Sequence, residues 1–188
     1  MSHATVTNES YDFFLESVKR QGANPGYGNL FVADPSDSHF LNVATAPNSG
    51  TAEGDLRIIT DDHTFSATFG FRTITLYRGD SQTEGTMPGD PGFKSNNYSP
   101  KGLVVGDDAA TREFIEQLKN KGVILLQQSP DCSDPRIIQY GCACSPAVVK
   151  DVKYTSGSRM TGGKKGYEIT FEALDMFDYQ GVVTLRTQ

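Results

Sequence analysis

The segment Thr64–Tyr77, TFSATFGFRTITLY, constrains the fold more than any other part of the sequence. Its first apolar residues recur at every second position, which is the period of a β-strand with one buried face. These residues are Phe65, Ala67, Phe69 and Phe71. Further on, Ile74 and Leu76 move the apolar side chains to the other face. We therefore expect one long strand, bent near Gly70, that leaves one packing environment for another.

Short segments with the same period occur on both sides of this stretch, separated by turn residues. We expect strands at 29–34, 39–45 and 55–60, and a buried strand at 123–128. The end of the chain predicts a β-meander with strands at 136–144, 146–158, 165–174 and 178–187. Within it, Tyr167, Ile169 and Phe171 share one face of a strand.

The segment Gly106–Gly122, GDDAATREFIEQLKNKG, has the spacing of an amphipathic helix. We expect Asp107 or Asp108 to cap its first turn, and Gly122 to end it in the left-handed conformation. A second helix of this type is expected over 9–22. About eight or nine strands and one core helix predict a mainly β fold: a β-sandwich or barrel with one packed α-helix and a short N-terminal helix, in a single domain, 1–188.

Residues 79–106 are rich in Gly and Pro and predict a long inserted loop. Loops of this length are uncommon in compact domains and are usually functional or disordered. An ordinary surface loop is one interpretation, but the segment carries several apolar side chains that favour contact with a partner chain. They are Met87, Phe93, Tyr98, Leu103, Val104 and Val105. The N-terminal segment, 1–26, is a second candidate arm for such contacts.

The charge of the chain argues against a nucleic-acid-binding protein. The 188 residues carry a net charge of −6; the first hundred hold 6 basic and 12 acidic residues, and the remainder holds 11 of each. Tight binding of DNA or RNA needs clustered Lys and Arg. The sequence begins without a secretion signal, and no apolar run approaches the roughly 20 residues of a spanning helix. We therefore expect no membrane association and thiols that stay reduced.

The cysteines are the first candidates for a chemical site, because Cys142 and Cys144 are one residue apart and Cys132 lies upstream. On a strand, residues i and i+2 lie side by side, which is a poor geometry for the converging thiolates of a zinc site. The other metal ligands, His3, His39 and His63, are distant in sequence. We expect the thiols to be buried packing residues and the protein to hold no metal.

Three further patterns are candidates for catalytic or phosphate-binding sites. Asp61, Asp62 and His63 favour a turn over a catalytic cluster. Glu168 and Glu172 share a strand face, as a glycosidase pair would, but alternating acids are ordinary on the solvated face of a sheet. The third pattern is a glycine-rich segment that lacks the P-loop spacing and predicts a basic hairpin loop. It contains Arg159, Gly162, Gly163, Lys164, Lys165 and Gly166. We expect no catalytic residue, no cofactor-binding residue and no cofactor.

The order of these elements resembles that of virion structural proteins of tailed bacteriophages. The resemblance rests on a run of strands, a long insertion, one helix continuing directly into GVILLQQ, and then RIIQYGCACSPAVVKDVKYTSGSRMTGGKKGYEITFEALDMFDYQGVVTL. The resemblance covers the chain from about Gly28 onward and is a pattern without a short diagnostic motif. The most similar group is that of the tail-tube proteins of phages with long tails.

The resemblance implies a tail-tube-like β-fold and a structural function in the virion, after assembly in the host cytoplasm. Members of that group form homo-oligomeric rings, commonly hexamers, whose inner strands close into a channel through which DNA passes. It implies that 79–106 contacts neighbouring rings, that 1–26 is an arm, and that the acidic N-terminal half faces the lumen. Neighbouring tail proteins are the implied partners, with genomic DNA only in transit and without sequence-specific binding.

Three other interpretations remain open. The expected N-terminal helix departs from the plainest tube subunit and is compatible with a connector, ring or terminator protein. A monomeric β-sandwich that binds carbohydrate, or a virion accessory protein, is the main alternative, although the absence of Trp argues against a carbohydrate site. An enzyme using Cys142, Cys144 or His63 is the third.

Overall fold

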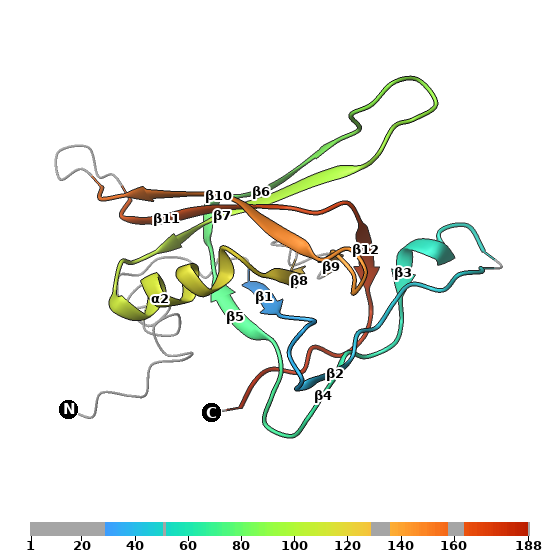
Figure 1. The fold of residues 1–188 in the computed structure, drawn as a ribbon, viewed down its shortest axis with the longest axis horizontal. Helices are drawn as coiled ribbons and strands as arrows, with labels where there is room; N and C mark the ends of the chain where they lie inside the picture. Colours follow the sequence, from blue (N-terminus) through green and yellow to red (C-terminus); the bar gives the residue numbers. More distant parts are fainter. Residues whose placement is uncertain (1–28, 51, 129–135, 158–163, 188) are drawn as a thin grey trace.

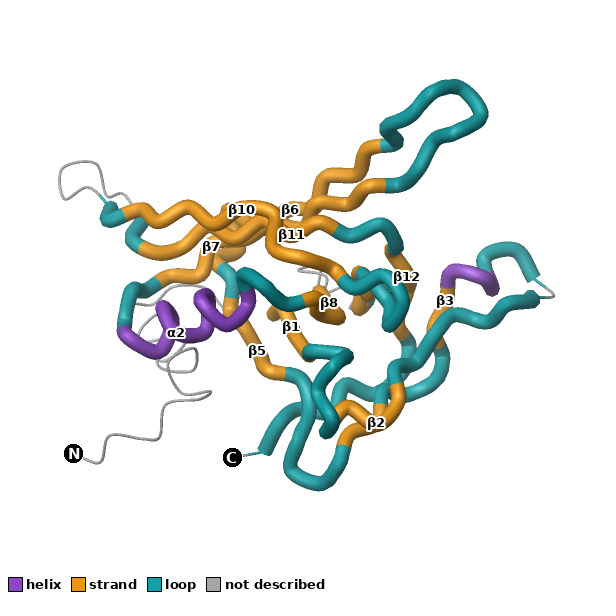
Figure 2. The backbone as a smooth tube through the Cα atoms, in the orientation of Figure 1, coloured by secondary structure: helices purple, strands orange, loops and turns teal. Residues whose placement is uncertain are grey.

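Strands dominate the computed structural model, which describes residues 29–50, 52–128, 136–157 and 164–187 (Figures 1 and 2). In chain order the elements are β1 Asn29–Ala33, β2 Phe40–Asn42, the 3₁₀ helix η1 Asp55–Arg57, β3 Ile58–Ile59, β4 Thr64–Phe65, β5 Arg72–Thr75, β6 Tyr77–Thr86, β7 Asn97–Val105, α2 Ala109–Leu118, β8 Gly122–Gln128, β9 Ile137–Tyr140, β10 Ala147–Thr155, β11 Gly166–Glu172 and β12 Met176–Tyr179. This confirms the predicted mainly β class with one packed helix. The expected helix at 9–22 lies outside the described residues.

Most strands belong to one curled sheet with the order β3-β12-β9-β8-β10-β11-β7-β6, and β1 lies between β8 and β5. Strand β8 pairs with β9 and, through its first two residues, with β10. The chain passes from β5, which pairs with β1, into β6, which pairs with β7. One continuous segment therefore joins the two ends of the curl. Strands β2 and β4 form a small separate sheet.

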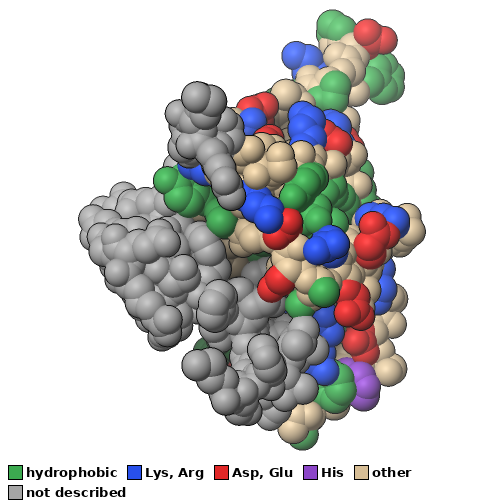
Figure 3. All heavy atoms as spheres, turned by 90° about the vertical axis from the view of Figure 1, so that its left-hand side faces the viewer, with side chains coloured by type: hydrophobic (Ala, Val, Ile, Leu, Met, Phe, Trp, Pro, Cys, Tyr) green, Lys and Arg blue, Asp and Glu red, His purple; other side chains and the backbone are tan. Residues whose placement is uncertain are grey.

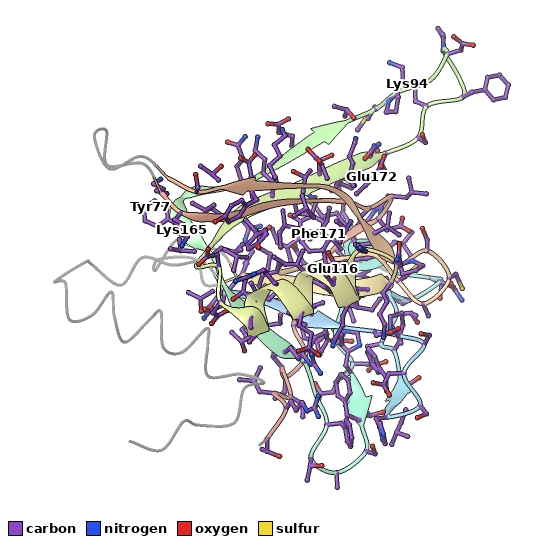
Figure 4. All side chains as sticks on the ribbon, turned by 60° about the vertical axis from the view of Figure 1, so that its left-hand side comes forward. Tyr77, Lys94, Glu116, Lys165, Phe171 and Glu172 are labelled. Carbon is purple, nitrogen blue, oxygen red and sulfur yellow. The ribbon has the colours of Figure 1, made fainter. Side chains whose placement is uncertain are left out.

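Strands β1 and β8 are buried on both faces, which the sequence analysis predicted for β8 alone. Leu30 and Val32 face one core, whereas Phe31 and Ala33 face the other. The first core lies inside the curl and includes α2 and β11, and Phe171 extends into it (Figure 4). The second lies between the sheet and the β2–β4 layer. Burying one large apolar side chain contributes roughly 1.5–3 kcal/mol, so the two faces together fix the position of these strands.

Helix α2 begins where the sequence predicts but ends differently. The Asp108 carboxylate accepts a hydrogen bond from the backbone N–H of Thr111 at 2.7 Å, and Phe114, Ile115 and Leu118 are buried in the first core. Gly122, expected as a left-handed stop, is instead the first residue of β8 and has no positive φ. A side chain there would lie 2.5 Å from Pro146, so close packing requires this glycine.

The long strand expected at 64–77 is wrong, because the segment is divided into β4, β5 and the start of β6. A turn at 66–70, in which the N–H of Phe69 donates to the carbonyl of Ser66, separates β4 from β5. The change of packing environment is real, because Phe65 and Phe71 pack in one core and Ile74 and Leu76 in the other. The strand partner changes at Leu76, from β1 to β7. Other strands are shorter than expected: β2 has three residues, β9 ends at Tyr140, and 180–187 forms only an isolated bridge at Leu185.

The prediction of a long loop at 79–106 is also wrong, because most of this segment is a β-hairpin that projects from the molecule (Figure 1). Strands β6 and β7 pair in antiparallel register as far as Thr86 and Asn97, leaving a tip at 87–96. The Gly and Pro residues favoured a loop in the prediction, but only Pro88, Gly89, Pro91 and Gly92 lie in this tip. Gly85 and Gly102 lie within the paired strands, and Pro100 lies where pairing of β7 with β11 is interrupted.

Candidate functional site: an assembly interface

Four antiparallel strands, β10-β11-β7-β6, form a sheet with two open edges within the described part of the chain. Only Ala147 and Val148 of β10 pair with β8, so the rest of β10, as far as Thr155, pairs with β11 alone. At the other end, β6 pairs only with β7. Both outer strands therefore present backbone N–H and C=O groups that can pair with another chain.

One face of this sheet is polar and carries charges of both signs. Figure 3, which views the molecule from the left-hand side of Figure 1, shows basic and acidic side chains interspersed on that side of the molecule. Lys101 Nζ lies 3.0 Å from Glu84 Oε1, and Lys150 Nζ lies 3.9 Å from Glu172 Oε1. The hydrogen bond from Lys101 holds the pKa of the Glu84 carboxyl below its usual value. Such exposed pairs add little stability, with a median of about 0–1 kcal/mol. The face is therefore suited to water or a polar neighbour, while the opposite face supplies Ile169 and Phe171 to the core.

The projecting hairpin has an ordered tip with exposed apolar side chains. The N–H of Phe93 donates to the carbonyl of Asp90, and the N–H of Ser95 donates to that of Pro88. Gly89 and Gly92 have positive φ, which closes the turn without strain. Phe93 is 85% exposed and Met87 is 66% exposed. A large apolar side chain held in this way is typical of a contact surface.

The opposite end of the sheet is fastened to helix α2 by a polar cluster. Asp107 accepts hydrogen bonds from Lys165 at 2.8 Å and from the Tyr154 hydroxyl at 3.0 Å. Both contacts lower the pKa of the Asp107 carboxyl, and its negative charge raises the pKa of Tyr154 and of Lys165. The cluster joins the β10–β11 hairpin to the chain just before the helix, which fixes the open edge of β10 relative to the body.

The cysteines do not pack as the sequence predicts. Cys142 and Cys144 follow β9 in a tight turn, in which Cys142 and Ser145 exchange backbone hydrogen bonds. Cys144 is exposed and Cys142 is half-buried, so the prediction that both thiols are buried on a strand is wrong. Cys132 lies outside the described residues. Within the described ranges, no group of three or more His, Cys, Asp or Glu side chains is arranged to hold a metal ion.

His63 also differs from its predicted position in a turn, because its ring is buried and part of a hydrogen-bonded network. Nδ1 accepts the N–H of Ala44 at 3.1 Å, and Nε2 lies 2.9 Å from Gln139 Oε1. The ring stacks on Tyr179 at a centroid distance of 4.9 Å. These contacts tie the β2–β4 layer to β9 and β12. Its role is therefore structural, and Gln139, which completes the network, gives no signal in the sequence beyond its place in an apolar strand.

The remaining candidates stay apart from one another. Glu168 and Glu172 lie on the polar face of β11, and Glu172 accepts a hydrogen bond from Asn97. Lys164 lies over the ring of Tyr77 at 3.8 Å, at the base of the β10–β11 hairpin, while 158–163 lie outside the described residues. The described helices include none that is long and apolar enough to cross a membrane.

The fold thus defines a mainly β protein whose curled sheet ends in open edges. No family model matches the sequence, and no curated protein matches it significantly. Among solved structures, a chain of the virion of a native gene transfer agent particle is 21% identical; the match covers 57% of this chain and 88% of that chain, with a TM-score of 0.35. A chain of the tail of an empty particle of this kind, with C6 symmetry, is 22% identical over 55% and 81%, also at 0.35.

Both neighbours belong to virion or tail particles, and neither is described as a tube subunit. Because both TM-scores lie below 0.5, we draw the functional conclusions from the geometry of this chain.

Proposed function

We propose that this protein is a non-catalytic structural subunit of a phage-like virion that assembles into rings of a tail tube or connector. The supporting observation is that, within the described residues, both edges of the sheet β10-β11-β7-β6 are open on the same chain. An edge that pairs with a different edge makes a heterologous contact, and such contacts close into rings when the rotation allows it.

The strand directions favour this pairing. Every neighbouring pair in the sheet is antiparallel, so β6 and β10 run in opposite directions. Rotation about a ring axis carries each strand to a copy with the same direction along that axis. The β6 edge of one copy then meets the β10 edge of the next in antiparallel register, and the sheet continues without a change of pattern.

We assign the polar face of the same sheet to the channel. Among the side chains that the structure describes on this face, four are acidic and three are lysines, so these side chains lack the excess of positive charge that binds DNA. They are Glu84, Asp151, Glu168 and Glu172, with Lys101, Lys150 and Lys153. This assignment places the lumen on residues between 77 and 172 rather than on the more acidic N-terminal half.

Electron microscopy of the purified protein in negative stain tests the proposal, and we expect concentration-dependent rings with a central hole. Zero-length cross-linking of amines to carboxylates, on a mixture of ¹⁴N- and ¹⁵N-labelled protein, then tests the pairing. We expect Lys153 of one copy to join Glu84 of another. Within one copy these strands are three strand spacings apart, roughly 14 Å, which excludes an internal link. A protein that stays monomeric at high concentration contradicts the proposal and favours a monomeric binding module.

The same proposal includes the expected contacts of 1–26 and of the hairpin with neighbouring rings. It also includes a position in the virion at which genomic DNA passes through the ring. Micrographs that show stacked rings support a tube subunit, while single rings support a connector.

A further inference from the structure

A pocket between α2 and the β2–β4 layer is lined by polar and charged side chains together with four phenylalanines, Phe40, Phe65, Phe69 and Phe114. We call it the aromatic pocket. Its volume is about 110 Å³. Sites for small-molecule ligands are larger, roughly 300–1,000 Å³. The size therefore fits one side-chain ring rather than a metabolite.

The rim of the aromatic pocket is charged. The Arg186 guanidinium lies 5.2 Å from the centre of the Phe69 ring, and His39 stacks on the same ring at 3.6 Å. Arg72 also lines the pocket. Lys121 and Asp34, on the same rim, form a pair at 2.8 Å that neutralises both charges. Asp37 is the remaining carboxylate, so the rim carries a small positive excess that favours an aromatic ring accompanied by an acid.

The tip of the β6–β7 hairpin offers that combination. Phe93 is the most exposed large apolar side chain of the described residues, and Asp90 is joined to it by the hydrogen bond that closes the turn. Because the tip is held by its own backbone bonds, little conformational freedom is lost when it docks. The other charge of the tip, Lys94, is opposite in sign to Asp37 on the rim (Figure 4).

The two surfaces lie at opposite ends of the molecule (Figures 1 and 2). The tip extends away on one side, and the β2–β4 layer that forms one wall of the pocket lies on the other. The tip therefore does not reach its own pocket, whereas a second copy placed beyond the first presents its pocket to the tip. A contact of this type repeats along a line.

We propose that Phe93 of one copy inserts into the aromatic pocket of another copy, with Asp90 facing Arg186, and that this contact joins successive rings. The inference rests on the proposed function, because it names the surface that receives the hairpin. The partner is a second copy of this chain, and the fit is that of a central aromatic anchor in a matching pocket.

Photo-cross-linking of the full-length chain tests this contact directly. The probe is p-benzoylphenylalanine in place of Phe93, in a mixture of ¹⁴N- and ¹⁵N-labelled protein at high concentration. We expect links between copies to peptides that line the aromatic pocket, around Phe69 and Gln117. Links confined to residues 1–28, to another surface or to the same copy would overturn the inference. Absence of rings in micrographs would contradict the proposed function, but links into the pocket would still establish the docking.

Two substitutions add a quantitative test. Phe93→Ser should weaken stacking of rings by about tenfold or more, as loss of an aromatic anchor does. The matched control is Val182→Ser, which removes another exposed apolar side chain, 67% exposed, outside the pocket and the tip. Asp90→Arg should also weaken stacking, and adding Arg186→Asp should restore it. The docking is contradicted if rings of the Phe93→Ser variant stack as well as rings of the unmodified protein. It is also contradicted if the double variant stacks no better than Asp90→Arg alone.

Discussion

The imidazole of His63 and the amide of Gln139 lie 2.9 Å apart, from Nε2 to Oε1, in the interior between the sheet and the β2–β4 layer. The N–H of Ala44 donates to Nδ1, which must therefore carry no proton. Nε2 then carries the hydrogen and donates to Gln139, whose own Nε2 donates to the carbonyl of Gly141. The tautomer of the neutral His63 ring is thus fixed by backbone groups on two other segments.

The first prediction concerns pH. Burial lowers the pKa of the His63 imidazole below its ordinary 6.5, although the hydrogen bond to Gln139 and the charge of Asp62 oppose this. The unfolded chain then binds more protons than the folded chain at pH values between the folded pKa and about 6.5, so stability rises with pH in that window. The contribution is complete above about pH 6.5 and is lost as the pH falls.

Urea unfolding between pH 5 and 8 measures this dependence. We expect His63→Asn to be less stable at neutral pH and to show a flatter profile below pH 6.5. A profile of equal slope in the variant would show that other groups cause the pH dependence.

The second prediction concerns Gln139, which is fully buried. Gln139→Ala leaves the Nε2–H of His63 and the carbonyl of Gly141 without their partner. An unsatisfied buried polar group costs about 1–3 kcal/mol, and we expect a loss of at least this size in the free energy of unfolding. Gln180→Ala is the control, because Gln180 is exposed. Equal stabilities of the two variants would show that the network adds no stability.

The third prediction concerns the start of β8. A Cβ at residue 122 would lie 2.5 Å from Pro146 Cγ, so Gly122→Ala forces β8 and the segment before β10 apart. Overpacking of this type costs about 1–3 kcal/mol, which urea unfolding would detect. Gly85→Ala is the matched control, because its Cβ would meet only the Tyr98 ring at 3.4 Å. A loss of stability in the control equal to that in Gly122→Ala would point to glycine replacement in general.

The fold was predictable where the local pattern and the final packing agree. Strands β1 and β8 are apolar on both faces and were expected, as was the Asp108 cap of α2. The pattern failed at 64–77, because Phe65 and Phe71 pack on Phe40 across a turn rather than along one strand. It failed at 79–106 because glycines and prolines that close a hairpin tip also indicate a loop.

The proposed assembly surfaces were partly predictable. The apolar content of 79–106 indicated a contact segment, and Phe93 was among the residues named. The open edges of β6 and β10 depend on which strands pair across the curl, and no local pattern encodes this. The buried network of His63 and Gln139 joins residues 76 positions apart and was missed for the same reason.

The last prediction concerns the thiols of the turn after β9. Cys144 is exposed and Cys142 is half-buried, and the Cys142 sulfur lies 3.9 Å from the carboxylate of Asp175. Exposure controls the access of a reagent to a thiol. We therefore expect Cys144 to react with iodoacetamide in the folded protein several-fold faster than Cys142. Peptide mapping by mass spectrometry assigns each modified residue, and Cys144→Ser should remove the fast modification while leaving the slower one unchanged. Protection of both thiols until the protein unfolds would restore the interpretation that they are packing residues.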